Sequence, residues 1–113
     1  MAPSTLEIGR AGEELALRHY RRRGFRCIDR NWRRSDGELD LVLRRGRTVV
    51  IAEVKYRRTS EYGTPAEAVD RAKQLRIKRL AVAWREHASW NGPIRFDIVE
   101  VLDGEVSVLQ NAF

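Results

Sequence analysis

The strongest pattern in the chain lies in residues 38–56, which read ELDLVLRRGRTVVIAEVKY. Polar and apolar residues alternate over 38–43, so the leucines of this segment should share one face of a strand (Leu39, Leu41 and Leu43). A run rich in β-branched residues over 48–56 is typical of a second strand. Because Arg45-Gly46 between the two runs suits a tight turn, we expect an antiparallel hairpin.

Upstream of this hairpin, apolar or small residues between Ile8 and Tyr20 recur at helical spacing and predict a helix over residues 5–23. Ser4 or Thr5 can cap its start, and Gly24 stands where a left-handed residue often follows a helix. A short strand over 25–30 and a polar loop or wide turn over 31–37 should lead from this helix into the hairpin.

Downstream of the hairpin, Thr64-Pro65-Ala66-Glu67 reads as a capping box with proline at the first helical position, and it predicts a helix over 65–88. Alternation over 94–102 predicts a further strand, which turns at Asp103-Gly104 and returns over 105–109. The expected order of elements is therefore α-β-β-β-α-β-β.

Length and composition favour one globular domain over residues 1–113, because 42% of its residues are hydrophobic and 34% are charged. No apolar run approaches the ~18 residues of a membrane span, and the first residues show no signal pattern. The single cysteine, Cys27, excludes an internal disulfide and has no partners at zinc-finger spacing. We therefore expect a cytoplasmic protein without a membrane partner.

The net charge gives the first indication of a partner. Lysine and arginine number 22 against 16 acidic residues, which gives +6, and the lysines are only Lys55, Lys73 and Lys78. The planar arginine fork matches phosphate, so a polyanion such as nucleic acid is a suitable partner. An arginine-rich genome would explain the same composition, so only the placement of the charges can distinguish this bias from a surface that binds a polyanion.

The hairpin places acidic residues close together. If Arg44 faces Arg47 across the turn, Asp40 lies opposite Ile51 and Glu53 lies diagonal to Asp40 on the same face. Diagonal neighbours in a sheet are roughly 7–8 Å apart at the backbone, within reach of two carboxylates that share an ion.

This face should carry an excess of negative charge. It holds Asp40, Glu53 and Glu38, which the same register places across from Glu53, against Lys55 alone. Two carboxylates about 5 Å apart repel by roughly 3 kcal/mol at an effective dielectric near 20, and one divalent cation would offset this. Carboxylates without Cys or His nearby suit Mg²⁺ or Mn²⁺. The alternative is an ordinary salt bridge of Asp40 or Glu53 with Lys55.

Asp40 followed by Glu53-Val54-Lys55 resembles the D…(E/D)-x-K signature of the restriction-endonuclease-like superfamily. More narrowly, the chain is similar to UPF0102, an uncharacterised bacterial family of predicted endonucleases related to archaeal Holliday-junction resolvases. The resemblance runs from about residue 9 to the end and rests on these stretches: Gly9-x-x-Gly12-Glu13-x-x-Ala16, Arg30-Asn31, Gly37-Glu38-Leu39-Asp40-Leu41, Glu53-Val54-Lys55 with Arg57, Gly63-x-Pro65, Lys73, Arg95-Phe96-Asp97 and Asn111-Ala112-Phe113.

The resemblance implies an α/β fold with a restriction-endonuclease-like α-β-β-β-α-β core, in which helices flank a mixed central sheet. It also implies a metal-dependent endonuclease that hydrolyses DNA, including branched or flapped structures. Asp40, Glu53, the backbone carbonyl of Val54 and Glu13 would then hold Mg²⁺ or Mn²⁺, and Lys55 would orient the attacking water or neutralise developing charge. For Glu13 the alternative is a solvated helix residue.

Several basic residues are expected to bind nucleic acid. Arg33, Arg34, Arg57 and Arg58 should lie in loops that bracket the hairpin, where they can contact phosphates. Lys73 falls on the second helix, where related nucleases often place a residue near the site. The alternative for all five is ordinary surface charge.

Two other functions compete with a nuclease: a non-catalytic nucleic-acid-binding module that kept the fold, and a protein-interaction domain with a basic surface. The resemblance to resolvases also suggests a homodimer, because one acidic cluster per chain would need a second copy to cut two strands. Candidate contacts are apolar, and a monomer could equally pack them against its own sheet (Trp90, Val108, Leu109 and Phe113).

Overall fold

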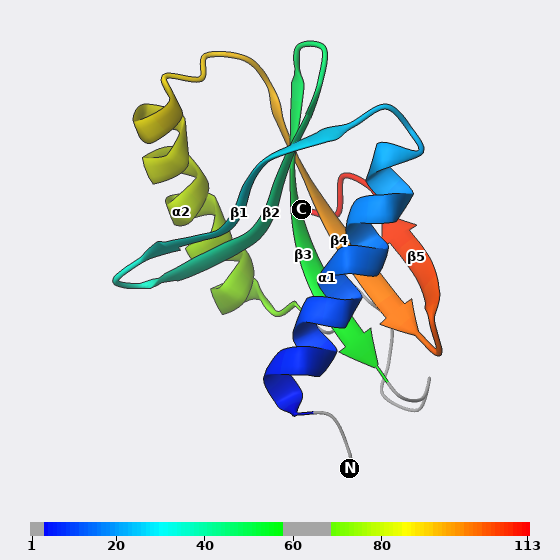
Figure 1. Cartoon of the computed structure of the whole chain (residues 1–113). Helices are drawn as coiled ribbons and strands as arrows, with labels where there is room; N and C mark the ends of the chain where they lie inside the picture. The colour runs from blue at the N-terminus through cyan, green and yellow to red at the C-terminus, as the bar shows by residue number, and fades with distance from the viewer. Residues whose placement is uncertain (1–3, 58–68) are drawn as a thin grey trace.

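The computed structural model describes residues 4–57 and 69–113 (Figure 1). In these ranges the elements follow the expected order: α1 (Thr5–Arg21), β1 (Arg26–Arg34), β2 (Gly37–Arg45), β3 (Thr48–Arg57), α2 (Arg71–Ala88), β4 (Ile94–Leu102) and β5 (Glu105–Leu109). None of the described helices is long and apolar enough to cross a membrane.

The strands form one mixed sheet in the order β1-β2-β3-β4-β5. Neighbouring strands run antiparallel except β3 and β4, which are parallel. A parallel pair needs a crossover connection, and the segment between β3 and β4 includes α2. The α/β class and the order of elements are thereby confirmed.

The helices cover opposite faces of the sheet (Figure 1). On one face, Leu17 and Tyr20 of α1 pack with residues of the sheet that include Leu41, Leu43 and Val50. On the other face, residues of α2 such as Leu80 and Trp84 pack on a second set of strand residues. Each helix therefore has its own apolar cluster, and the central strands are buried on both sides.

The first helix agrees with its prediction. The Ser4 side chain accepts a hydrogen bond from the backbone N–H of Glu7, and Gly24 adopts a left-handed φ of +86°. The strand after it is longer than expected, because β1 continues to Arg34 and pairs with β2 throughout. The predicted loop or wide turn over 31–37 was therefore too long, because only residues 35 and 36 form a turn and residues 31–34 continue β1. Its polar residues lie on the edge strand of the sheet, where side chains can face water.

The second helix begins later than predicted. Helix α2 starts at Arg71, and the Asp70 side chain caps it by accepting a hydrogen bond from the backbone N–H of Lys73 at 2.8 Å. An aspartate at this position satisfies one of the free N–H groups of the first turn. The expected capping box, Thr64-Pro65-Ala66-Glu67, lies outside the described residues.

The β2–β3 hairpin forms, but its register differs from the expected one by two residues. Arg45 pairs with Thr48, so Gly46 and Arg47 make the turn and Gly46 takes a φ of +60°. A glycine is favoured at the first turn position because it adopts positive φ without steric cost. One step beyond the last pair, Leu41 with Ala52, Asp40 stands across from Glu53 and not from Ile51.

The first residues of β2, those before Leu41, do not pair with β3. The shared face expected for the three leucines is broken there, because Leu39 packs in the α2 cluster while Leu41 and Leu43 pack in the α1 cluster. The β1–β2 hairpin leans toward α2 in Figure 1, and Gly37 lies against Arg76 and Leu80. This divergence opens a space between β2, β3 and α2.

The C-terminal residues pack against the same chain. Phe113 stacks on Phe96 with ring centroids 5.1 Å apart, Val108 packs against the α1 cluster and Trp90 against the α2 cluster. Leu109 remains 41% exposed. Three of the four candidate dimer contacts thus adopt the alternative arrangement, and the homodimer stays a prediction.

Candidate active site

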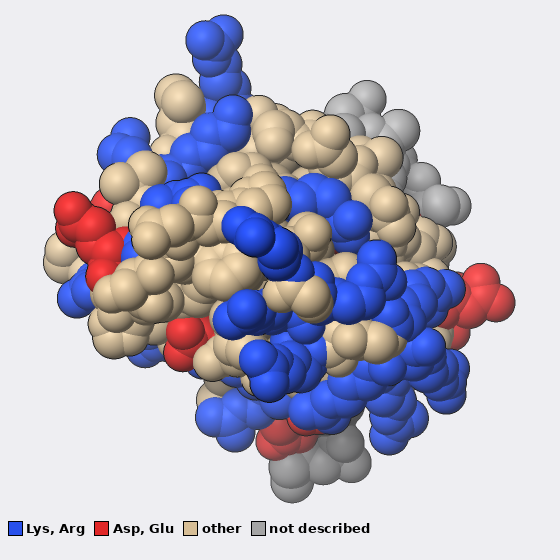
Figure 2. Space-filling model, turned by 90° about the horizontal axis from the view of Figure 1, so that it is seen from above, with Lys and Arg blue, Asp and Glu red and all other residues tan. Residues whose placement is uncertain are grey.

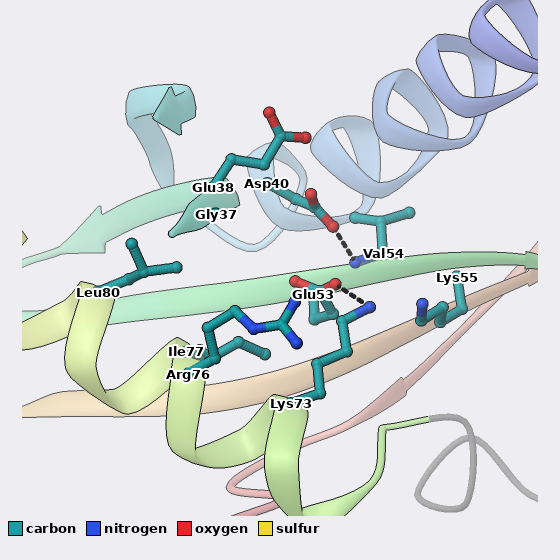
Figure 3. A pocket seen from close by; sticks show the side chains of 10 residues that line it. All are labelled: Gly37, Glu38, Asp40, Glu53, Val54, Lys55, Lys73, Arg76, Ile77 and Leu80. Carbon is teal, nitrogen blue, oxygen red and sulfur yellow. Dashed lines mark hydrogen bonds and ion pairs between the residues drawn. The ribbon is translucent and has the colours of Figure 1, made fainter. Parts of the chain in front are cut away.

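A pocket of about 400 Å³ occupies the space between β2, β3 and α2 (Figure 3). Its lining includes Glu38 and Asp40 of β2, Glu53 and Lys55 of β3, and Lys73 of α2. The acidic cluster and the lysine of the signature therefore meet at one place, as the sequence predicts, although the register that brings them together is different.

Asp40 is the most electrostatically perturbed carboxyl group of the pocket. Its Oδ2 accepts a hydrogen bond from the backbone N–H of Val54 at 2.9 Å. Burial, reinforced by the negative charge of Glu53, raises the pKa of Asp40 to about 8, and the hydrogen bond from Val54 opposes this only in part. Among the described residues, no ion pair includes Asp40, so it lacks a directly bound positive partner.

Glu53 is buried in β3 and has such a partner. Nζ of Lys73 lies 2.8 Å from its Oε1, with 9% of the Glu53 side chain exposed. Burial disfavours the charged form of Lys73, but the hydrogen bond and charge of Glu53 outweigh burial and raise the Lys73 pKa. Lys55 shows the opposite direction, because burial and the nearby Lys73 lower its pKa.

The charge excess inferred from the sequence was wrong for the folded pocket. The lining contains the three expected carboxylates, Glu38, Asp40 and Glu53, but α2 adds Lys73 and Arg76 to Lys55. Three formal negative charges thus face three formal positive ones. The sequence pattern of the hairpin could not show this, since two of the cations come from a helix about twenty residues further along the chain.

Arg76 is a pocket residue that the sequence analysis did not single out. Its side chain extends over the pocket in Figure 3, and its stem lies against Gly37, where an added Cβ would come within 3.2 Å of Arg76 Cδ. The available signal was helical spacing, because Arg76 follows Lys73 by three residues and so shares its face of α2.

Glu13 lies beside this pocket but does not line it. Arg30 Nε and Asn31 Nδ2 donate to its Oε1 at 3.1 and 3.2 Å, and its charge helps to raise the pKa of Asp40. Its position in α1 is therefore close to the acidic cluster, with its carboxylate held by two residues of β1. Its role as a ligand stays a prediction.

The arginines expected to contact phosphates are distributed differently from the prediction. Arg33 and Arg34 belong to β1 and Arg57 ends β3, so none of the three lies in a loop. Arg33 pairs with Glu38 at 2.8 Å, Arg34 lies 4.6 Å from the ring centroid of Trp32, and Arg57 pairs with Glu100 at 2.8 Å. Arg58 lies outside the described residues.

Three carboxylates line the pocket, and two of them, Asp40 and Glu53, belong to the predicted metal ligands. In the described parts of the chain, no three Asp, Glu, His or Cys side chains are grouped as a metal-binding set. Asp40 and Glu53 face the same pocket, and Val54 also belongs to its lining. Such a set contains oxygen donors without nitrogen or sulfur, which matches the preference of Mg²⁺ and Mn²⁺.

Comparison with known proteins places this arrangement in a family. The model of the uncharacterised protein family UPF0102 matches residues 12–101. The chain belongs to the UPF0102 family. It is 51% identical to a UPF0102 protein of Renibacterium salmoninarum over 98 residues, covering 86% of this chain and 83% of that protein. A UPF0102 protein of Paenarthrobacter aurescens is 47% identical over 100 residues, with 88% and 83% covered.

The UPF0102 match includes every residue that lines the pocket, from Gly37 to Leu80. It also spans the strands β1–β3, β4 up to its penultimate residue, and the crossover helix α2. The pocket is thus a feature of the part of this chain that matches the UPF0102 model. The family description assigns no activity, and function has to be argued from the geometry.

Proposed function

We propose that this UPF0102 protein is a metal-dependent endonuclease of the restriction-endonuclease-like kind that hydrolyses phosphodiester bonds in DNA. The observation that carries the proposal is the convergence of Asp40, Glu53 and Lys55 on one pocket, at the point where β2 leaves β3. Two acidic groups and a lysine in a shared polar pocket form the minimum set for metal-assisted hydrolysis.

The pocket fits a hard divalent cation. Asp40 Oδ2 accepts a hydrogen bond from Val54, while no described residue donates one to Oδ1. Its pKa of about 8 means that the buried carboxyl group would gain from a cation beside it. Mg²⁺ or Mn²⁺ held by Asp40 and Glu53 would polarise the scissile phosphate and lower the pKa of the attacking water. Val54 and Glu13 are further proposed ligands.

The remaining side chains have distinct proposed tasks. Lys55, whose pKa is lowered by burial and by Lys73, can orient the attacking water and stabilise the charge that develops on phosphate. Arg76 reaches across the mouth of the pocket from α2 and presents a guanidinium group to the phosphate backbone. Lys73 neutralises the charge of Glu53 in the absence of metal. When Glu53 binds a cation, Lys73 becomes available to contact phosphate.

A metal titration with a substrate panel tests the proposal. Purified protein with Mg²⁺ or Mn²⁺ is incubated with labelled duplex, branched, flapped and single-stranded DNA, and products are resolved on denaturing gels. We expect at least one substrate to be cut, and Asp40→Asn and Glu53→Gln to abolish the cut. Lys78→Gln, which removes an exposed charge outside the pocket, should leave it unchanged.

Two outcomes would decide against this function. Cleavage that persists in Asp40→Asn and Glu53→Gln would place the activity elsewhere or in a contaminant. DNA binding without cleavage in either metal, together with equal Mn²⁺ affinity of wild type and Asp40→Asn by calorimetry, would leave the non-catalytic binding module.

A further inference from the structure

Five arginines gather at the end of the sheet that lies away from the pocket. They lie just after α1, at the start of β1, at the end of β2 and in the β2–β3 turn, and we call them the distal arginine surface: Arg23, Arg26, Arg44, Arg45 and Arg47. Figure 2 views this end of the molecule and shows far more Lys and Arg than Asp and Glu. Glu53 follows Arg47 by six residue steps along β3, which is about 20 Å of extended chain.

The side chains of this surface are held by uncharged groups. Arg44 Nε donates to the Gly46 carbonyl at 2.9 Å, and its guanidinium lies 4.6 Å from the ring centroid of Trp90. Arg45 donates to the Arg23 carbonyl at 2.8 Å and lies 4.4 Å from the ring centroid of Phe25. Carbonyls and aromatic rings fix the orientation of a guanidinium and leave its full charge in place.

Some other arginines of the protein pair with acidic side chains. Arg30 pairs with Glu13 and Glu14, Arg33 with Glu38, and Arg95 with Asp97. In the described parts of the chain, no ion pair includes a member of the distal arginine surface.

Two arginines of this surface also repel each other. Arg26 and Arg44 are direct partners across the β1–β2 ladder, and like charges directly opposite each other destabilise a sheet. Local rules that are broken at one place often mark a functional site. An anion bound between these strands would relieve the repulsion.

A hollow of about 400 Å³ lies within this surface. Arg44, Arg47 and Trp90 line it together with the backbone of the α2–β4 connection. The Trp90 ring is fixed, because its Nε1 donates to the Pro93 carbonyl at 3.2 Å and an added Cβ at Gly92 would lie 2.5 Å from the ring. Two guanidiniums at a polar hollow with one fixed ring are suited to phosphate groups, because apolar area to anchor a protein partner is small.

We propose that the distal arginine surface binds the phosphate backbone of double-stranded DNA at a second contact, about 20 Å from the pocket. The inference rests on the proposed function, because it deepens it: the substrate would be a duplex long enough to reach both the pocket and the turn. Contacts to phosphate alone carry no sequence information, so this second contact adds affinity and orientation.

Binding without metal tests this contact separately from cleavage. Anisotropy of a labelled 30-base-pair DNA duplex is measured with the full chain in EDTA over a salt series. Arg44→Gln with Arg47→Gln should weaken binding about tenfold or more and flatten the plot of log affinity against log salt by about two. Lys78→Gln with Arg79→Gln removes the same charge from the exposed face of α2 and should change affinity less than about threefold. Thermal melting checks that both variants fold.

Equal losses in the two double variants would mean that net charge alone governs binding, and they would overturn the inference. The inference would also be overturned if the distal variant lost affinity for polyglutamate, used as a model of an acidic protein, while it kept its affinity for DNA. That result would assign an acidic protein partner. If wild type binds and cuts DNA while the distal variant behaves like wild type, the second contact is wrong and the proposed function stands. If wild type neither binds nor cuts any DNA, both are wrong.

Discussion

Nζ of Lys73 lies 2.8 Å from Oε1 of Glu53, so a cation from the crossover helix α2 already neutralises the buried carboxylate of β3. The same carboxylate is a proposed metal ligand. Lysine and a divalent cation would therefore compete for one carboxylate, and the positive charge of the lysine would oppose metal binding. Lys73 should therefore stabilise the metal-free protein and lower its affinity for metal.

Substituting Lys73→Gln should change these quantities in opposite directions. Glu53 loses its partner while 9% exposed, so we expect the free energy of unfolding to fall by about 1–3 kcal/mol in metal-free buffer. Removing the competing charge should raise Mn²⁺ affinity by about tenfold. Urea denaturation and calorimetry measure the two effects, with Lys78→Gln as the matched control. A fall in both quantities would contradict the competition.

Asp40 should make the stability of the protein depend on pH. Its pKa is about 8 in the folded state against 3.8 when unperturbed, so between these values the folded state retains a proton that the unfolded state has lost. Proton release then favours unfolding, and the contribution of Asp40 to stability falls as pH rises from about 4 to about 8. Asp40→Asn should remove this slope. Melting temperatures of the two proteins from pH 5 to 8 should therefore diverge, with the variant the more stable at pH 8.

Gly37 has a steric role next to the pocket. Its φ is +145°, and an added Cβ would meet Arg76 Cδ at 3.2 Å and Leu80 Cδ1 at 3.3 Å. Gly37→Ala should lower the free energy of unfolding by about 1–3 kcal/mol, because both backbone strain and crowding oppose it. Gly9→Ala is the control: this helical glycine has open space around it, and the change should stabilise the protein by about 0.5–1 kcal/mol. Equal effects at the two sites would contradict the steric role.

The residues that could be predicted are those whose pattern is local. Alternation and turn residues placed β4 and β5 at Ile94–Leu102 and Glu105–Leu109, as the structure has them. The hairpin strands were also found, but their register depends on whether Gly46 is the first or second turn residue, and a shift by one residue in the turn moves every cross-strand pair by two.

Long-range contacts could not be predicted in the same way. The partner of Glu53 comes from α2. The position of α2 depends on the divergence from β3 of the first residues of β2, those before Leu41. The sequence pattern does not indicate at which residue the pairing of two strands ends. The α2 cations were therefore missing from the predicted charge balance, although Lys73 itself had been named.

Asp97 should be structural and not part of the proposed reaction. It is 0% exposed, and it accepts hydrogen bonds from the Tyr20 hydroxyl at 2.7 Å, from Arg95 at 2.9 Å and from the backbone N–H of Asn111 at 3.0 Å. Asp97→Asn should lower the free energy of unfolding by about 2–4 kcal/mol, because it removes the charge that Arg95 faces. Mn²⁺ affinity of the folded variant should match wild type. Urea denaturation and calorimetry would contradict this if stability were kept while metal affinity fell.

Arg76 should act on the substrate and not on the metal. Its guanidinium extends over the pocket from the same helical face as Lys73, and in the described residues it takes part in no ion pair. Arg76→Ala should lower kcat by about 10²-fold, because a fixed charge aimed at the developing negative charge is lost, while Mn²⁺ affinity stays within about twofold. Arg76→Lys should recover only part of the rate, since a lysine offers a point charge in place of a fork. Arg79→Ala, an exposed change one helical turn along α2, should leave the rate unchanged. If Arg76→Ala cuts DNA at the wild-type rate, or if it loses metal affinity together with rate, Arg76 does not contact the reacting phosphate.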